Sequence, residues 1–461
     1  MFNNLIKFGN KTALIDYELG NLTFKEIIKE TKRIQNKLNS ENIVLLVASN
    51  SLESVTGYIA FLNHPKTITI LVDKSFKSKF INGIINLYKP NFIFAPKEFK
   101  FEVNTEEITV KKKSYKLHKT FFKKFKKINF KNFLLLSTSG TTQNPKFVRL
   151  SKQNILSNTK NIISYLSIKS SHTTITTMPM GYSYGLSIIN THLFAGSKIL
   201  LNEKTIFESE FWKRIRENKI SSFGGVPEFY EYLKKLKFEK QNISSLVYIT
   251  QAGGKMNEEY LKYLGNICSN FNIKFFVMYG QTEASPRMSY LDWKKFNVKP
   301  NSIGKPLKGC HFELLGKNKK KINKKNTIGE IVFYGKNVCL GYANSQKDLQ
   351  KGDENKKKLF TGDLGVKDKD NYFYIVGRKN RIIKLFGKRC NLKDIENFLK
   401  IKGIKANCYQ NDKKLQLNLL SNHVVEKVKN DLSEYLGINK NFILIKKNNI
   451  STFKVVKNYE K

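Results

Sequence analysis

The sequence has few cysteines and histidines, and neither type is grouped. Five cysteines and six histidines occur in 461 residues, and no two cysteines stand in a CxxC spacing. A disulfide framework needs pairs of cysteines, and a zinc site needs thiolate or imidazole ligands at short, regular spacing. These absences argue against a disulfide-stabilised domain and against a zinc site.

Long apolar runs are also missing. A transmembrane helix needs about 20 consecutive apolar residues, and no stretch of the chain approaches that length. The N-terminal residues lack the cationic and then apolar pattern of a secretion signal. Because 40% of the residues are nevertheless hydrophobic, we expect a globular, cytoplasmic protein without a transmembrane segment.

Acidic residues are scarce beside basic ones. The chain has 37 aspartates and glutamates against 82 lysines and arginines, a formal net charge of +45. Clustered cations bind nucleic acid or anionic membranes through counterion release. Here the lysines occur in every region, in stretches that are also rich in asparagine, and a genome-wide codon bias accounts for that distribution. We therefore expect no specific nucleic-acid partner, although the same field would favour phosphate-rich small molecules or an acidic protein.

The order of patterns along the chain predicts more than one folded unit. Up to Ser285, β-rich runs alternate with helical periods, and several runs end in glycine-containing loops. This alternation predicts a largely parallel sheet with helices on its faces and ligands at the carboxyl ends of its strands. From Ile303, closely spaced turn signals favour a small antiparallel barrel or sandwich. After Arg378–Arg381, two helical and two strand-like segments predict a separate α+β unit.

One stretch joins an apolar run to a hydroxyl-rich loop and a lysine. Leu134–Leu136 precede six small or hydroxylated residues, Ser137–Thr142, and Pro145 and Lys146 follow. Hydroxyls and backbone N–H groups donate to phosphates, glycine allows close approach, and lysine adds positive charge. The spacing is not that of a P-loop, in which Gly-Lys-Ser/Thr opens a helix. A solvated turn between two strands is the structural alternative for this stretch.

Five motifs, in this order, resemble the adenylate-forming superfamily of acyl-CoA synthetases, peptide-synthetase adenylation domains and luciferases. STSGTTQNPK (Ser137–Lys146) is similar to the family's phosphate loop, and MYGQTEAS (Met278–Ser285) to its adenine and magnesium motif. The others are GEIVFYGKNVCLGY (Gly329–Tyr342), FTGDLG (Phe360–Gly365) and GRKNRIIKLFGKRCNLKDIE (Gly377–Glu396). Each motif alone is weak, but five in the family's order make a chance match remote, and the resemblance covers nearly the whole chain.

The resemblance implies an α/β fold in two domains. Residues 1–378 would form a large N-terminal domain of layered α/β subdomains with a small β-rich subdomain. Residues 379–461 would form a small, mobile α+β lid. The implied activity is ATP-dependent conversion of a carboxylic acid to an acyl-adenylate, with release of pyrophosphate and transfer to a thiol. The implied cofactors are ATP and Mg²⁺, and the acceptor is CoA or the phosphopantetheine of an acidic acyl or peptidyl carrier protein.

The motifs imply roles for particular residues. Thr282 would contact the α-phosphate as a catalytic residue, and Glu283 would act beside it as the magnesium ligand, since a carboxylate suits a hard cation. Tyr279 would lie against adenine, and Asp363 with Arg378 would bind the ribose hydroxyls. The ATP-binding residues that the resemblance implies are Thr138, Ser139, Gly140, Thr141, Thr142, Lys146, Gly253, Gly254, Tyr279, Gly280, Gln281, Asp363, Arg378 and Lys384.

The lid of the family supplies a catalytic lysine and a hinge. Lys454 matches this lysine, and Lys457 is the alternative because Phe453 stands where the family usually has glycine. The matching hinge position is Asn380, about which the lid would rotate between the two half-reactions.

The implied acid pocket lies in PMGYSYGL and GVPEFYEYL, with Tyr182, Gly185, Val226 and Pro227 as its residues. Tyr182 stands where relatives often carry histidine, so a neutral hydroxyl replaces a titratable imidazole. Amino-acid-activating relatives commonly place an aspartate in this region, whereas no acidic residue occurs between positions 178 and 193. A carboxylate without an α-amino group is therefore favoured.

Two other functions stay open at the level of sequence. One is an adenylation protein that loads an amino acid onto a carrier protein. The other is a basic nucleic-acid-binding or scaffold protein that has kept the fold without catalysis. The presence of Lys146, Thr282, Glu283, Asp363 and Arg378 argues against the second.

Overall fold

The computed structural model resolves the chain into two compact units. The larger comprises Met1–Thr138, Lys146–Thr361 and Gly365–Val376, and the smaller is formed by Gly377–Lys461 with Gly362–Leu364 from the preceding sheet. The predicted domain limit after residue 378 stays a prediction. The structure describes residues 1–110, 114–123, 128–137, 146–316, 318–379, 382–385, 388–404, 406–411, 414–419 and 425–447.

The first sheet of the larger unit has the strand order β19-β9-β8-β4-β3-β5-β7-β6. Alternate residues of β3 face different cores: Leu46 packs with helices α1 and α2, and Leu45 packs with α3. A strand covered on both faces reads as a continuous apolar run, as NIVLLVA does. The strands are β3 (Asn42–Ala48), β4 (Thr67–Asp73), β5 (Phe92–Pro96), β6 (Thr105–Ile108), β7 (Tyr115–Thr120), β8 (Leu134–Ser137), β9 (Phe147–Leu150) and β19 (Gly341–Ala343).

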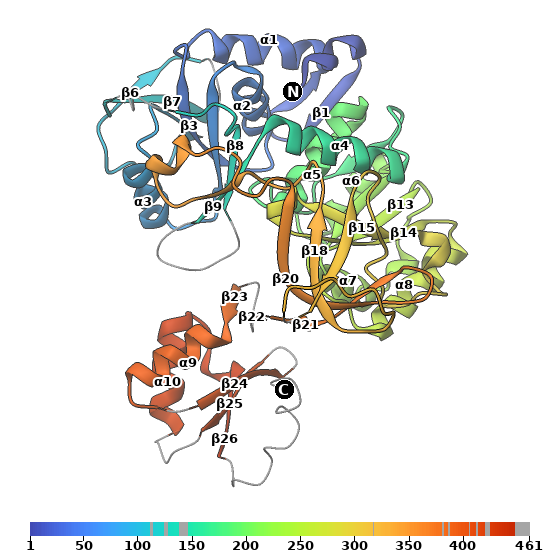
Figure 1. Cartoon of the computed structure of the whole chain (residues 1–461). Helices are drawn as coiled ribbons and strands as arrows, with labels where there is room; N and C mark the ends of the chain where they lie inside the picture. The colour runs from blue at the N-terminus through green and yellow to red at the C-terminus, as the bar shows by residue number, and fades with distance from the viewer. Residues whose placement is uncertain are drawn as a thin grey trace. The chain divides into compact units, whose positions relative to one another are not determined.

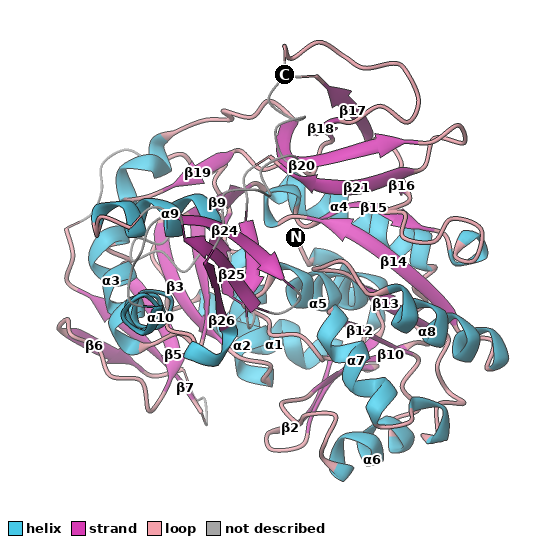
Figure 2. Ribbon diagram, turned by 90° about the horizontal axis from the view of Figure 1, so that it is seen from below, coloured by secondary structure: helices cyan, strands magenta, loops and turns pink. Residues whose placement is uncertain are grey.

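The second sheet has the order β16-β15-β14-β13-β12-β10-β11-β1-β2. Its centre is parallel from β1 to β14, as the strand–helix alternation predicts, and β15 returns antiparallel to β14. Figure 2 shows β12, β13, β14 and β15 side by side. The strands are β1 (Thr12–Asp16), β2 (Gly20–Thr23), β10 (Thr173–Ile175), β11 (Lys198–Leu201), β12 (Ser222–Gly225), β13 (Tyr248–Gln251), β14 (Lys274–Gly280), β15 (Arg287–Leu291) and β16 (Lys305–Pro306).

Helices fill the space between the two sheets and cover their outer faces. One core joins α1, α2 and α5 to strands of both sheets, whereas α6, α7 and α8 pack on the other face of the second sheet (Figure 1). Within the described part of the chain, no helix is long and apolar enough to cross a membrane. The helices are α1 (Phe24–Gln35), α2 (Leu52–Asn63), α3 (Ser78–Tyr88), α4 (Lys152–Leu166), α5 (Ser183–Ala195), α6 (Ser209–Glu217), α7 (Pro227–Lys235) and α8 (Glu258–Asn270), with short 3₁₀ helices at η1 (Asn3–Phe8), η2 (Phe238–Lys240), η3 (Thr282–Ala284), η4 (Trp293–Lys295) and η5 (Gln346–Gln350).

The β-rich region after Ile303 differs from the predicted barrel or sandwich. It is one four-stranded sheet, in the order β17-β18-β20-β21, and its apolar face packs on Tyr279 and Met288 from the second sheet. Because these side chains already cover that face, no second sheet of its own is needed. The strands are β17 (His311–Leu315), β18 (Gly329–Tyr334), β20 (Lys358–Lys367) and β21 (Phe373–Arg378).

The smaller unit has its own hydrophobic core, formed by α9, α10 and a three-stranded sheet. The predicted helices and strands are present, and β24 and a β22–β23 hairpin are additional to them. Its elements are β22 (Ile382–Leu385), β23 (Lys388–Asn391), α9 (Leu392–Ile401), β24 (Ala406–Asn411), β25 (Lys414–Leu419), α10 (Val425–Leu436), η6 (Lys440–Phe442) and β26 (Ile443–Lys447).

Candidate active site

The chain turns sharply at the carboxyl end of β14, where Gly280, Gln281 and Thr282 follow one another. A Cβ on Gly280 would lie 2.0 Å from the carbonyl oxygen of Pro286, so only glycine permits this close approach. The backbone N–H of Gln281 donates to that same oxygen at 2.9 Å, and its Nε2 donates to Thr361 O at 3.0 Å. These bonds hold the turn in one conformation.

Thr282 lies against the N-terminus of α5. Its Oγ1 is 3.1 Å from Oγ of Ser183, the first residue of that helix. The N-cap residue, Tyr182, makes no side-chain cap bond, so the first N–H groups of α5 receive no acceptor from it. Two hydroxyls beside such a helix end suit an anion, because the N–H groups and the helix dipole both favour negative charge.

Glu283 is held by the segment that contains β19. The Tyr342 hydroxyl donates to Glu283 Oε1 at 2.9 Å, and Cys339 N–H donates to the Glu283 carbonyl oxygen at 2.8 Å. Lys146 Nζ lies 3.5 Å from the centre of the Tyr342 ring, a cation–π contact. Burial, and after it the Glu283 carboxylate, raises the pKa of Tyr342, so the phenol stays a hydrogen-bond donor.

The surroundings of Glu283 fit a hard cation that also binds phosphate. No lysine or arginine in the described ranges forms an ion pair with this carboxylate. The described residues also contain no cluster of three histidine, cysteine or acidic side chains. Mg²⁺ is commonly held by one or two carboxylates together with substrate phosphates and water, and a single oriented glutamate matches that pattern.

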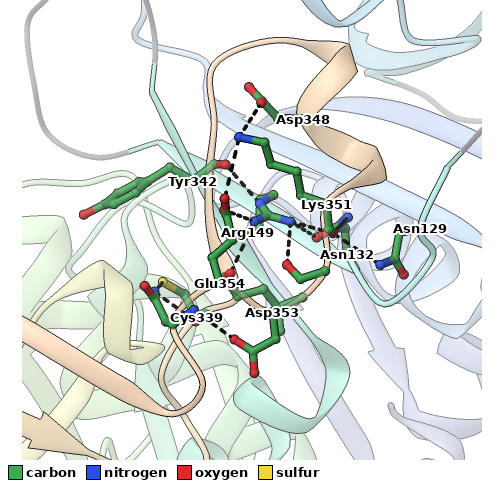
Figure 3. A network of polar contacts seen from close by, with 12 residues as sticks. Asn129, Asn132, Arg149, Cys339, Tyr342, Asp348, Lys351, Asp353 and Glu354 are labelled. Carbon is green, nitrogen blue, oxygen red and sulfur yellow. Dashed lines mark hydrogen bonds and ion pairs between the residues drawn. The ribbon is translucent and has the colours of Figure 1, made fainter.

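Arg149 of β9 fixes the segment that carries Tyr342. Its side chain is fully buried, and its Nε donates to the Tyr342 carbonyl oxygen at 3.0 Å. Nη1 donates to Lys351 O at 2.7 Å and to Asn132 Oδ1 at 3.1 Å, and Nη2 bonds the Glu354 carboxylate. Figure 3 shows these acceptors around the guanidinium. The network ties residues before and after β19 to the strand that follows the predicted phosphate loop.

In the smaller unit, Asp363 and Arg378 form an ion pair. Arg378 Nε lies 2.5 Å from Asp363 Oδ1, and Asp363 is only 1% exposed. The pairing fixes the orientation of a buried carboxylate that the motif assigns to the ribose.

Five of the residues predicted for the acid and nucleotide pockets lie together near the end of β13. Gly253 has φ of +91°, and a Cβ there would stand 3.0 Å from the Tyr182 hydroxyl and 3.1 Å from Val226. Gly254 lies similarly against the Pro227 ring, at 3.2 Å. Gly185 differs, because its Cα faces the carbonyl oxygen of Pro179, to which a Cβ would come within 2.1 Å. Gly185 thus allows α5 to pack against the preceding loop.

A cavity lies further along α5, on the side of the second sheet. The centre of a water molecule can occupy about 20 Å³ of it, which is room for about one or two waters. Aromatic, aliphatic and hydroxyl side chains form most of the lining, and Arg287 of β15 is the charged residue among the described lining residues. The lining residues are Ile162, Leu166, Thr174, Tyr184, Ser187, Ile188, Thr191, His192, Ser222, Phe223, Gly224, Tyr248, Thr250, Met278 and Arg287.

Several predicted site residues lie outside the described residues. These are Thr138, Ser139, Gly140, Thr141 and Thr142 of the phosphate loop, the hinge residue Asn380, and the lid lysines Lys454 and Lys457. Lys384 lies in β22, and its side chain also falls outside the description.

Sequence reasoning did not select Ser183, Tyr342 or Arg287. Tyr342 closes the third motif, so its position in the motif was the available signal. Arg287 comes two residues after the second motif and opens a strand, RMSYL, without another charged residue. A cation in such a strand is unusual, because lysine and arginine are rarely fully buried without a partner.

The strand order, the layered helices and the site at the end of β14 define a member of the adenylate-forming superfamily. A model of the family described as AMP-binding enzyme matches residues 2–343, and the chain belongs to this family.

Comparison with known proteins gives distant relatives of the same kind. Oxalate–CoA ligase of Arabidopsis thaliana is 28% identical over 271 residues, 58% of this chain and 52% of the relative. The 2-succinylbenzoate–CoA ligase of Enterococcus faecalis is 26% identical over 273 residues, 59% of this chain and 55% of the relative. The chain thus matches about half the length of these curated relatives.

Among solved structures, a double mutant of o-succinylbenzoate CoA synthetase from Bacillus subtilis, bound to a product analogue, superimposes with a TM-score of 0.74 at 19% identity. The match covers 98% of this chain and 96% of that one. At this identity the likeness establishes the shared fold, with its large N-terminal and small C-terminal domains, as the sequence predicted.

Proposed function

We propose that this protein activates a carboxylic acid with ATP and then transfers the acyl group to a thiol, either of CoA or of a carrier-protein phosphopantetheine. In the first step a carboxylate oxygen bonds to the α-phosphorus, and pyrophosphate leaves. In the second, the thiol sulfur bonds to the acyl carbon, AMP leaves, and the thiol proton passes to solvent. The observation that carries the proposal is the meeting of Thr282, Glu283, Ser183 and Tyr342 at the end of β14.

The proposed phosphate site combines the hydroxyl-rich loop with Lys146, Thr282 and Glu283. Phosphoryl-type transfer depends mainly on positioning and on neutralising charge. Thr282 and the first N–H groups of α5 would donate to the α-phosphate and stabilise the charge that develops there. Glu283, oriented by Tyr342, would hold Mg²⁺, whose charge neutralises phosphate oxygens. A structure of the Bacillus subtilis synthetase solved with ATP and a magnesium ion shares the fold at a TM-score of 0.68 and 19% identity, over 97% of this chain and 96% of that one.

The nucleoside would lie between the glycine turn after β13 and the turn after β14. Gly253 and Gly254 would floor the adenine pocket, and Tyr279, Gly280 and Gln281 would line it. A Cβ at Gly280 would collide with the Pro286 carbonyl oxygen, and the φ of +91° at Gly253 disfavours any other residue. Asp363 would accept hydrogen bonds from the ribose hydroxyls, with Arg378 holding it and Lys384 assisting.

The smaller domain would act in both steps, as a lid. Lys454, or alternatively Lys457, would neutralise the carboxylate and α-phosphate during adenylation, before rotation about Asn380 admits the thiol. CoA and carrier proteins are both anionic, and a net charge of +45 favours their association.

The acid pocket supports a substrate without an α-amino group. Tyr182, Gly185, Val226 and Pro227 would surround the reacting carboxylate, and no aspartate or glutamate occurs among the described residues of the cavity beyond them. An ammonium group would therefore find no carboxylate there. The named acids of the two CoA ligases above, oxalate and 2-succinylbenzoate, also lack an amino group.

ATP–pyrophosphate exchange tests the proposal. We expect exchange with one class among fatty, aromatic, hydroxy, dicarboxylic and amino acids, and loss of exchange in Lys454→Ala but not in Lys457→Ala. Exchange with amino acids alone would instead identify an amino-acid adenylation protein. If no acid supports exchange, the proposal is wrong, and the protein is a non-catalytic scaffold that has kept the fold.

A further inference from the structure

Arg287 is a buried cation without an acidic partner in the described part of the chain. The residue is 2% exposed, and its Nε is buried with no hydrogen-bond partner. No ion pair to a described carboxylate involves it, and its guanidinium carbon lies 5.1 Å from the centre of the Tyr184 ring. A guanidinium loses strong hydration when it is buried, and a cation–π contact recovers only part of that loss.

Hydrogen bonds from two asparagine side chains fix the backbone of Arg287 at the start of β15. Asn158 Oδ1 accepts from Arg287 N–H at 3.2 Å, and Asn158 Nδ2 donates to Arg287 O at 2.7 Å. Asn337 Nδ2 donates to the same carbonyl oxygen at 2.8 Å. These side chains come from α4 and from the segment before β19, and they fix the start of β15 beside the cavity.

The polar groups near Arg287 are uncharged. The Tyr165 hydroxyl interacts with the guanidinium, and burial raises the pKa of this phenol, so it stays neutral. His192 Nδ1 lies 2.8 Å from the carbonyl oxygen of Ile188 and its Nε2 lies 3.0 Å from the Tyr248 hydroxyl, so a neutral imidazole satisfies both contacts. Burial lowers the pKa of His192 to about 4. Burial raises the pKa of Tyr184 to about 12, against the opposing charge of Arg287. Both groups are therefore neutral near pH 7, and the cavity presents a single cation.

The cavity follows α5 away from the proposed reaction centre. Ser183, which contacts Thr282, opens the helix, and Ser187 and Thr191 line the cavity. At a rise of 1.5 Å per residue, these two lie about 6 Å and 12 Å along the axis from Ser183. An acid whose carboxylate lies at Ser183 and Thr282 would thus extend its far end toward the cavity.

We infer that the acid is a dicarboxylate whose second carboxylate displaces water from the cavity and pairs with Arg287. The inference rests on the proposed function for the position of the reacting carboxylate. Guanidinium and carboxylate form two parallel charge-assisted bonds, and such a pair among mostly apolar lining residues discriminates strongly against a neutral end group. The same cation would repel an α-ammonium group. Arg287 is therefore a specificity-determining residue.

The test compares dicarboxylic acids from glutarate to sebacate with their monomethyl esters, which keep the length and remove the charge. ATP–pyrophosphate exchange is measured for the wild type, Arg287→Met, Arg287→Lys and Arg216→Met, whose arginine is exposed on α6. We expect kcat/KM of the wild type to favour one diacid over its ester by about 10- to 100-fold. Arg287→Met should abolish that preference while keeping exchange with the ester, Arg287→Lys should keep part of it, and Arg216→Met should keep all of it.

Two results would overturn the inference and leave the proposed function intact: a wild type that uses ester and diacid equally, or an Arg287→Met protein that still prefers the diacid. If the wild type exchanges with no acid, the proposed function fails, and thermal shift decides the inference by itself. Stabilisation of the wild type, but not of Arg287→Met, by a diacid supports the subsite, and equal shifts refute it. If Arg287→Met does not fold, the wild-type preference and Arg287→Lys decide the outcome.

Discussion

Two arginines of the larger unit are buried almost completely, but their surroundings are opposite. Arg149 is 0% exposed and Arg287 is 2% exposed. The three nitrogens of Arg149 all donate, to backbone carbonyls, to Asn132 and to Glu354. Arg287 has a buried Nε without a partner and lies beside a cavity.

The difference separates a structural cation from a binding cation. A buried charge is tolerated when hydrogen bonds and an ion pair replace its hydration, and it is costly otherwise. At Arg149 the protein supplies those groups, so the residue joins residues 340–354 to β9. At Arg287 the protein supplies the Tyr184 ring and the Tyr165 hydroxyl, but Nε has no partner and no described carboxylate pairs with the charge.

The largest expected effect is at Arg149. Arg149→Met leaves several buried carbonyl oxygens and Asn132 without their donor, so the larger unit should lose about 3–5 kcal/mol of stability. Thermal and urea unfolding would measure the loss, and Arg216→Met is the control, expected to change stability by less than about 0.5 kcal/mol. A small effect at Arg149 would mean that its network is not what holds β19 in place.

The second prediction concerns the neutral imidazole beside Arg287. Because burial lowers the pKa of His192 from 6.5 to about 4, the unfolded chain binds more protons between these values. The free energy of unfolding is therefore unaffected by His192 above pH 6.5 and decreases as the pH falls toward 4. At 1.36 kcal/mol per pKa unit, the decrease reaches about 3 kcal/mol.

Unfolding measured from pH 7 to 4 should therefore have a shallower slope in His192→Gln than in the wild type. His311 is exposed on β17, so His311→Gln should keep the wild-type slope. An unchanged slope in His192→Gln would show that the imidazole titrates normally and that a second cation can form beside Arg287.

The third prediction concerns the hydrogen bond between Tyr342 and Glu283, the proposed magnesium ligand. Tyr342→Phe removes the hydroxyl that donates to Glu283 at 2.9 Å. A bond to a charged group contributes about 1.5–3 kcal/mol when buried, and Glu283 is half-buried, so we expect Mg²⁺ activation of exchange to weaken by about tenfold. Tyr17→Phe is a matched control, because Tyr17 makes a phenol–carboxylate bond of 2.9 Å to Glu217 at the surface. Equal Mg²⁺ dependence in both variants would remove Tyr342 from the site.

Of the two buried arginines, Arg287 is the one whose replacement should change stability least. Methionine removes an unpaired charge and keeps an unbranched side chain of similar reach, and such exchanges are often neutral or stabilising. Arg287→Met should therefore unfold within about 1 kcal/mol of the wild type, in contrast to Arg149→Met. A loss as large as that at Arg149 would show that Arg287 is structural after all.

Much of the local structure was predictable because its causes are local. Ser151 precedes α4 and its Oγ accepts from the N–H of Asn154 at 3.1 Å, as a helix cap does. Pro227 stands at the first turn of α7, where its missing N–H costs nothing. The run NIVLLVA and the strand–helix alternation likewise gave the parallel sheet.

The long-range features were not predictable in this way. β19 leaves the β-rich region and pairs with β9, Tyr342 opposite Val148, although its sequence reads as part of the same meander. The expected barrel or sandwich is one sheet because Tyr279 and Met288 cover its face. In the site, the motifs pointed to Thr282 and Glu283 but not to their partners, which lie 99 and 59 residues away in the chain.

The sequence by itself determined the family, the order of the motifs and the residue types at the proposed nucleotide site, since each depends on residues close together in the chain. It did not distinguish the two arginines: FVRL and RMSYL are both mostly apolar strands with one cation. Only the tertiary structure brought Lys351, 202 residues away, to accept from Arg149 and placed Arg287 beside a cavity instead. The physical reason is that the burial of a strand residue follows from the apolar pattern around it in the sequence. Its hydrogen-bond partners, in contrast, depend on which distant segments the fold brings next to its side chain.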